Sequence, residues 1–274
     1  MIVRKSPAEL ESMARAGAVV AALHEVVRAA AQPGVSTAEL DALAEREVRN
    51  RRAVPSFKGY RGFPATLCTS VNDQVVHGIP SPDVILREGD LLKVDAGAVV
   101  DGYHGDSAAT WIIGDSASDA VRDLVEATRA GLWAGLTRAR VGGRLTDVSS
   151  AIEQAGLAGG YGVVREYGGH GIGRALHEDP RVPNYGRSGR GPRLVAGLTL
   201  AIEPLYSLGE DATEVLADDW TVVTVDGSLS AHWEHTVAVT PAGPWVLTAR
   251  SDEPAWPLAE PGADARGLDA VEAG

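Results

Sequence analysis

Two aspartates on either side of a predicted β-turn could bind a cation together. The segment 91–106 contains two apolar runs joined by Asp101-Gly102, a strong signal for a two-residue hairpin loop. Such a loop places Asp106 opposite Gly97, so Asp95 and Asp106 lie on the same sheet face. They are then diagonal neighbours about 7–8 Å apart. Two carboxylates aimed at one spot repel each other unless a cation lies between them. Surface aspartates beside an exposed turn are the alternative.

Further potential ligands follow along the chain. His170 and His177 stand among glycines, which allow the close backbone approach that a crowded site requires. Glu203 ends an apolar run and Glu234 adjoins another, with Asp226-Gly227 as a hairpin turn ahead of it. A carboxylate in such a place is costly unless it is paired or bound to a metal. Structural histidines and glutamates at an exposed strand edge remain the alternatives.

The combined set is rich in oxygen, with four carboxylates (Asp95, Asp106, Glu203 and Glu234) beside one histidine. That composition suits a pair of hard or borderline divalent ions such as Mn, Fe, Co or Zn. A structural zinc site would favour cysteines. The chain has a single cysteine, Cys68, which excludes an internal disulfide and suits a reducing compartment.

Two pairs of predicted helices must position these segments. A capping box at Ser6–Glu9 opens the first helix, Pro33-Gly34 ends it, and a second helix starts at Ser36. Short β-branched runs from 53 to 110 then predict strands and turns. Two more helices on either side of Gly142-Gly143, followed by strands, repeat this order. The repetition predicts two similar α+β halves that share one sheet system.

The overall composition is that of an ordinary soluble globular protein. The 274 residues are 45% apolar and 23% charged, and residues 1–250 are interpreted as one catalytic domain. Residues 251–274 have no periodic apolar face, which predicts a disordered tail. A net charge of -12 argues against a broad nucleic-acid-binding face. Without a signal peptide or a membrane-spanning run, we expect a cytoplasmic location.

The motifs together resemble the type I methionine aminopeptidases over residues 4–248. Each motif alone is weak, but all of them in this order and spacing are specific. They are Thr69–Pro80 with His77, the Asp95 and Asp106 hairpin with His104-Gly105-Asp106, Gly169–Gly173, Ile202-Glu203-Pro204 and Glu234-His235-Thr236. The resemblance implies a pita-bread α+β fold with two halves related by a pseudo-twofold axis, in agreement with the repeated order of elements.

The resemblance also implies the site chemistry. Asp95 would chelate one of two ions, His170 and Glu203 would bind the other, and Asp106 and Glu234 would bridge them. A water between the ions would become the nucleophile, with Glu203 as proton carrier.

Two further histidines match family positions and are expected to contact the substrate. His177 would stabilise the oxyanion and His77 would handle the scissile amide. A turn residue is the alternative for His77.

An apolar pocket for the methionine side chain is also implied by motif position. Its expected lining is Phe57, Tyr60, Phe63, Cys68, Leu176 and Trp220. These large, soft or apolar side chains suit an unbranched thioether, although plain core is the alternative. Three positions depart from the family: Leu176 where an aromatic is common, Ala65 where lysine is frequent, and Arg61 where histidine or tyrosine is frequent. The departures put the pocket shape in doubt but leave the metal ligands intact.

The expected function is therefore removal of the initiator methionine from nascent polypeptides. We expect a monomer whose partners are the N-terminal segments of these chains, with the ribosome as a further candidate partner. Prolidases and Xaa-Pro aminopeptidases share the metal core but usually carry an additional domain ahead of it, whereas 76 residues precede His77 here. The short interval from His177 to Glu203 argues against the type II insertion. A metal-free pita-bread binding protein is kept as the non-enzyme alternative.

Overall fold

The computed structural model describes residues 2–254 and contains four long helices in that range. Capping boxes start the first two of them at Ser6 and Ser36, as predicted. In each box the serine side chain accepts a hydrogen bond from the backbone amide of the glutamate three residues on. The side chain of that glutamate accepts one from the serine amide. The helices are α1 (Pro7–Ala30), α2 (Thr37–Asn50), α3 (Asp119–Arg138) and α4 (Leu145–Ala158).

The central hairpin forms with the predicted register. Strands β4 (Leu91–Val100) and β5 (Tyr103–Ile112) pair so that Gly97 lies opposite Asp106. The two turn residues, Asp101-Gly102, have φ of 52° and 78°, which aspartate tolerates and glycine adopts freely. The prediction that Asp95 and Asp106 share a sheet face is therefore confirmed.

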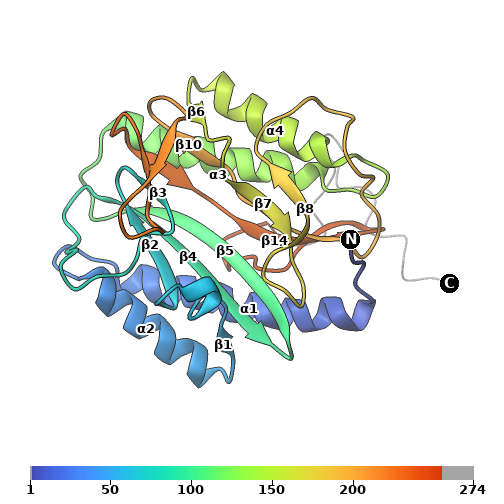
Figure 1. Cartoon of the computed structure of the whole chain (residues 1–274), viewed down its shortest axis with the longest axis horizontal. Coiled ribbons are helices and arrows are strands. Elements are labelled where there is room, and N and C mark those ends of the chain that lie inside the picture. Colours follow the sequence, from blue (N-terminus) through green and yellow to red (C-terminus); the bar gives the residue numbers. More distant parts are fainter. Residues whose placement is uncertain (1, 255–274) are drawn as a thin grey trace.

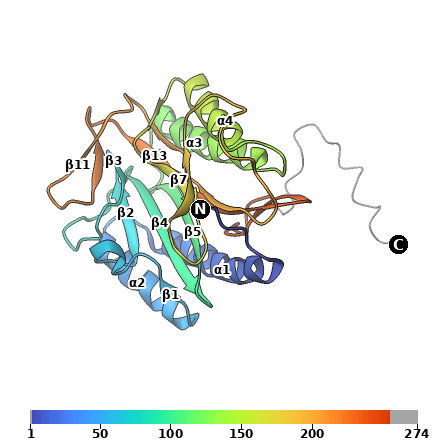
Figure 2. The ribbon, with the colours of Figure 1, turned by 45° about the vertical axis from the view of Figure 1, so that its right-hand side comes forward.

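The remaining strands are short, and together with the hairpin they form four hydrogen-bonded sheets in the described residues. Figure 2 shows β11 at the outer edge of the structure. The strands are β1 (Val54–Pro55), β2 (Leu67–Val71), β3 (Gln74–Val76), β6 (Gly162–Val163), β7 (Gly168–Gly171), β8 (Glu178–Pro183), β9 (Thr199–Ile202), β10 (Leu205–Ser207), β11 (Thr213–Val215), β12 (Val222–Thr224), β13 (Ser230–His232), β14 (His235–Thr240) and β15 (Gly243–Val246), with a 3-10 turn at Tyr60–Gly62.

The strands lie between the two helix pairs, with α1 and α2 on one side and α3 and α4 on the other (Figure 1). Helices α2 and α4 both have 14 residues, and their starts at Thr37 and Leu145 are 108 positions apart. Each pair covers its own apolar core, one including Leu23 and Leu40 and the other Leu132 and Ile152. The predicted two-half α+β architecture is confirmed.

The two halves meet where β5 contacts the segment ahead of β14. The strands belong to separate sheets rather than to one sheet system as predicted. The amide of Glu234 donates to the carbonyl of Ala108 at 3.0 Å. The Thr236 hydroxyl accepts from the amide of Asp106 at 3.0 Å and donates to its carbonyl at 2.8 Å. The contact between the halves thus passes through residues that adjoin, or are, predicted metal ligands.

Close packing of α1 fixes the hairpin from the other side. Gly105 of β5 faces Gly17 of α1, and a Cβ atom at Gly105 would lie 2.8 Å from the Gly17 nitrogen. Glycine is therefore required for this close approach of helix and strand. This packing sets the position of β5 at Asp106, the next residue along the strand.

Two sequence-based expectations need adjustment. Asp226-Gly227 forms a turn, but β12 pairs with β11 and β3 while β13 pairs with β10, so the predicted hairpin there is wrong. Order continues past residue 250: Glu253 bonds to His235 and Arg250 with a side chain that is 1% exposed. The rest of the predicted tail, 255–274, lies outside the described residues. Among those that are described, no helix has the length and apolarity to cross a membrane.

Candidate metal centre and active site

Five strands or strand ends bring the predicted ligands together. Asp95 comes from β4 and Asp106 from β5, on the shared face of the hairpin. His170 lies in β7, Glu203 directly follows β9, and Glu234 lies between β13 and β14. Strands β7 and β9 are paired, with His170 opposite Ala201. This pairing places the His170 imidazole near the end of β9, which Glu203 follows.

The side chains form a compact cluster. Ligand atoms of Asp106, His170 and Glu234 all lie within 4.8 Å of one another, and all three residues are buried. His170 Nε2 is 4.0 Å from Asp106 Oδ2 and 3.7 Å from Glu203 Oε1. These separations suit donors that share an ion at about 2.0–2.2 Å from each.

Burial makes the four carboxyl groups poor acids in the absence of a cation. It raises the pKa of Asp95 to about 7 and that of Glu203 to about 8, where the charge of Asp95 adds to the effect. It also raises the pKa of Asp106 and Glu234 well above the usual range, with further increases from neighbouring carboxylates. Grouped carboxyls of this kind favour a bound divalent cation over ionisation without one.

Three buried oxygens in the cluster are consistent with a bound metal. Asp95 Oδ1, Asp106 Oδ1 and Glu234 Oε1 have no hydrogen-bond partner. Within residues 2–254, the ion-pair contacts of Asp106 and Glu203 are with histidines, not with lysine or arginine. Unpartnered buried carboxylate oxygens are costly, and a hard or borderline divalent ion would satisfy them. The site is therefore suited to divalent metal binding.

A cavity of about 150 Å³ opens directly beside the cluster. Its wall contains all six residues of the predicted pocket: Phe57, Tyr60, Phe63, Cys68, Leu176 and Trp220. Phe63 and Trp220 meet edge to face with ring centroids 5.1 Å apart. Most of these side chains also belong to one apolar cluster, so the pocket is a gap within that part of the core. The two sequence-based interpretations, a methionine pocket and plain core, therefore describe the same residues.

Both predicted substrate histidines line the same cavity. The ring of His177 stacks on Tyr60 at 5.4 Å, and its Nδ1 is 2.9 Å from the Tyr60 hydroxyl. His77 lies edge to face with Tyr167 and Trp220 at 5.9 Å and 6.2 Å. Burial lowers the pKa of His77 to about 4 and lowers that of His177. Both rings are then neutral at pH 7 and can each donate one N–H.

Two residues at the site were not assigned a role from the sequence. Arg61, noted above only as a family departure, lines the cavity. His232 is buried, with Nε2 at 3.8 Å from Glu203 Oε2. The alternation of side chains along 230–234 could have identified it, because residues 232 and 234 point to the same side of an extended segment.

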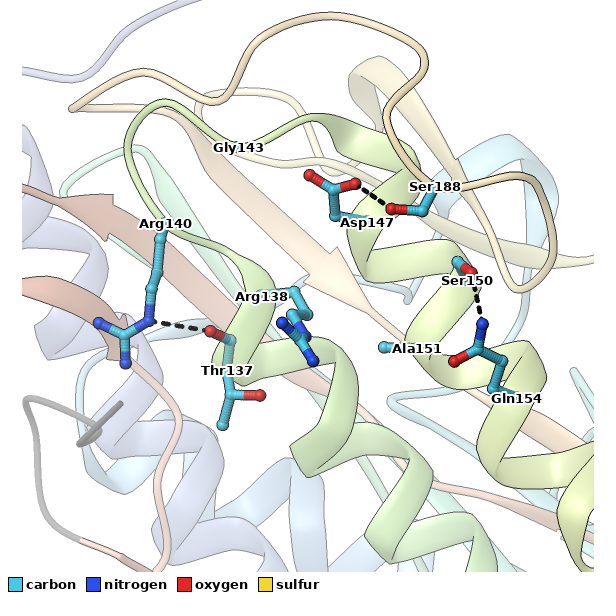
Figure 3. A pocket seen from close by; sticks show the side chains of 9 residues that line it. All are labelled: Thr137, Arg138, Arg140, Gly143, Asp147, Ser150, Ala151, Gln154 and Ser188. Atoms are coloured by element: carbon cyan, nitrogen blue, oxygen red, sulfur yellow. Dashed lines mark hydrogen bonds between the residues drawn. The ribbon is translucent and has the colours of Figure 1, made fainter. Parts of the chain in front are cut away.

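A second hollow lies between the end of α3 and the start of α4 (Figure 3). Asp147 accepts a hydrogen bond from the Ser188 hydroxyl, and Gln154 donates one to Ser150. It shares no lining residue with the cavity beside the carboxylates. Its drawn polar groups are largely paired with each other, and it is not part of the site.

Two helix pairs around strands that converge on a carboxylate and histidine cluster define a pita-bread metallopeptidase. The model of metallopeptidase family M24 matches residues 11–241. The chain is 54% identical to methionine aminopeptidase 1 of Mycobacterium tuberculosis, covering 90% of this chain and 95% of that one. It is 50% identical to a methionine aminopeptidase of Clostridium acetobutylicum, covering 90% and 99%.

Solved structures agree. A methionine aminopeptidase from Thermotoga maritima superimposes with a TM-score of 0.89 at 43% identity, covering 91% of this chain and all of that one. A prolidase from Pyrococcus furiosus gives a TM-score of 0.73 at 21% identity and shares the fold. The chain belongs to metallopeptidase family M24 and, within it, to the methionine aminopeptidases.

Proposed function

We propose that this protein hydrolyses the first peptide bond of polypeptides that begin with methionine. The observation that carries the proposal is one cavity that is lined both by the carboxylate cluster and by large apolar side chains. A metal-binding cluster of this kind can activate water, and the apolar part of the lining can accept an unbranched side chain. An N-terminal methionine would present its first carbonyl to the cluster when its thioether contacts the apolar side chains.

We propose that the cluster binds two divalent ions, of Mn, Fe, Co or Zn. Asp95 would bind one, His170 and Glu203 the other, and Asp106 and Glu234 both. When bound, the ions lower the pKa of a water molecule and polarise the substrate carbonyl. Three carboxylate oxygens without a hydrogen-bond partner support this proposal, because together they offer more ligand atoms than a single ion pair would use.

The chain's own side chains would carry the remaining steps. Glu203 would accept the proton of the attacking water and pass it to the leaving amine. His177, whose ring orientation is fixed by stacking on Tyr60, would donate an N–H to the developing oxyanion. His77, which lines the same cavity, would donate to the scissile amide region. Such positioned donors typically contribute about 10²–10³-fold in rate each.

We further propose that the protein acts as a cytoplasmic monomer on the N-terminal segments of nascent chains, with the ribosome as a candidate partner. The buried thiol of Cys68, beside the carboxylates, favours a reducing compartment because oxidation would add polar atoms to the pocket wall.

Hydrolysis of a peptide panel tests this function. The protein would be stripped with a chelator and assayed on Met-Ala-Ser, Leu-Ala-Ser and Ala-Pro-Ser before and after addition of Mn²⁺ or Co²⁺. We expect release of methionine alone, and only after metal addition. Cleavage of Ala-Pro-Ser instead would favour the Xaa-Pro alternative, and a chain that binds metal but releases no residue would favour the binding-protein alternative.

The pocket assignment predicts a specific defect in Trp220→Ala. Removing the indole opens one wall of the cavity, so kcat/KM for Met-Ala-Ser should fall by about tenfold or more, mainly through KM. Val225→Ala is a matched control because Val225 is 58% exposed on the same β11–β12 region. Equal KM values for the Trp220 variant and the unchanged protein would remove Trp220 from the pocket.

A further inference from the structure

His232 is a buried histidine at the site with no assigned partner. It is 1% exposed and ends β13, two residues before Glu234. Its Nε2 has no hydrogen-bond partner among the described residues, although it is inaccessible to water. A buried polar atom in that state points to a group that it meets during function.

The backbone of His232 is held on both sides. Its amide donates a hydrogen bond to the Thr110 hydroxyl at 2.9 Å, and its carbonyl accepts one from the same hydroxyl at 2.7 Å. Ser230, at the start of the same strand, accepts from the buried ammonium of Lys93 through its carbonyl at 3.0 Å. These hydrogen bonds fix the backbone position from which the His232 ring extends.

The imidazole is directed at Glu203. His232 Nε2 lies 3.8 Å from Glu203 Oε2, while His170 Nε2 lies 3.7 Å from Oε1 of the same carboxylate. Two histidines thus face the two oxygens separately. The side-chain amide of Asn184 donates to the Glu203 carbonyl at 2.9 Å and fixes its backbone. With the backbone fixed, the Glu203 side chain can still rotate the plane of its carboxylate.

We propose that His232 is a positioning residue that donates Nε2–H to Glu203 Oε2 and sets the plane of that carboxylate. The two atoms are 3.8 Å apart, and a small rotation of the Glu203 carboxylate would bring them to hydrogen-bond length. The other oxygen is then left facing His170 and the ligand cluster. The proposal rests on the proposed function of Glu203.

Three substitutions separate a hydrogen-bond donor from a merely space-filling side chain. His232→Gln keeps an N–H donor of similar reach, His232→Asn keeps the amide but is too short, and His232→Leu keeps volume without a donor. Each metal-loaded variant would be measured for kcat and KM on Met-Ala-Ser. We expect kcat to fall about 10–100-fold in the Leu and Asn variants with little change in KM, and to recover to within about threefold in the Gln variant.

A second readout does not depend on turnover. The visible absorption spectrum and dissociation constant of Co²⁺ bound to each variant report on the ligand field. We expect the Gln variant to match the unchanged protein and the Asn and Leu variants to differ from it in spectrum. If the unchanged protein cleaves no peptide, the proposed function fails while these spectra still test His232.

Defined outcomes would overturn the proposal. One is a Gln variant as impaired as the Leu variant, which would indicate shape alone. Another is loss of Co²⁺ affinity by more than about a hundredfold in all three variants, which would make His232 a ligand. Unchanged kcat in the Asn variant would also overturn it. Should the Leu variant fail to fold, the comparison of Gln with Asn decides.

Discussion

Replacing Asp106 by asparagine is expected to reduce kcat for Met-Ala-Ser by about a thousandfold or more while the fold is retained. The substitution preserves shape, but an amide nitrogen cannot bind a cation, and one charge is removed from a shared site. The hairpin should persist because the backbone of Asp106 is held by Thr236 and its neighbour Gly105 packs on α1. The measurements are steady-state turnover, metal content and circular dichroism.

Asp101→Asn is the matched control for this substitution. Asp101 lies in the turn of the same hairpin, is 64% exposed in its side chain and pairs only with Arg15 in the described contacts. Asparagine tolerates the positive φ of this position, so turnover should stay within about twofold. Full activity in the Asp106 variant, with metal content verified, would contradict the proposed mechanism.

The hairpin was predictable because its register follows from local rules. A two-residue Asp-Gly loop fixes which residues oppose each other, and alternation of side chains then places two aspartates on one face. Both capping boxes were predictable for the same reason, since each involves residues three positions apart. The convergence of His170, Glu203 and Glu234 was different: the residues themselves argued for ligands, but their meeting point came from the family resemblance.

What could not be predicted depends on contacts between distant segments. His77 has a φ of 60°, and the glycine that follows it packs so closely on Thr69 that a Cβ atom there would clash with the Thr69 carbonyl. The approach of His232 to Glu203 joins β13 to the end of β9, and no local spacing encodes it. The Asp226-Gly227 turn was misinterpreted because an Asp-Gly turn can also connect strands of different sheets.

Removal of metal is expected to make the fold sensitive to alkaline pH. Unfolded aspartate and glutamate titrate near pH 4, whereas the folded, metal-free protein has pKa values of about 7 for Asp95 and about 8 for Glu203. Between these limits the folded state holds protons that the unfolded state has released. Their stabilising contribution is complete below about pH 4 and is lost as the pH rises through 7 and 8.

Other buried groups define the pH range in which to measure this effect. Burial lowers the pKa of His170 and His232 to about 3, so they destabilise the fold only below about pH 6.5. Lys93, with its pKa lowered by burial to about 7, acts against the carboxyls at alkaline pH. Lys93 is a single group, whereas the site holds four carboxyls whose pKa is raised. Between pH 7 and 8.5 the net change in stability should therefore have the sign of the carboxyl contribution.

Over that interval the melting temperature of the metal-free protein should fall, while that of the metal-loaded protein should stay nearly constant. A bound ion keeps the carboxylates charged and displaces their protons, so the stabilisation by metal should be larger at pH 8.5 than at pH 7. At a thousand times the dissociation constant, metal adds about 4 kcal/mol, or about 8 °C or more in melting temperature. Calorimetry with and without Mn²⁺ measures both. Asp106→Asn should reduce the metal-dependent increase, whereas equal increases at the two pH values would show that the carboxylates are already ionised without metal.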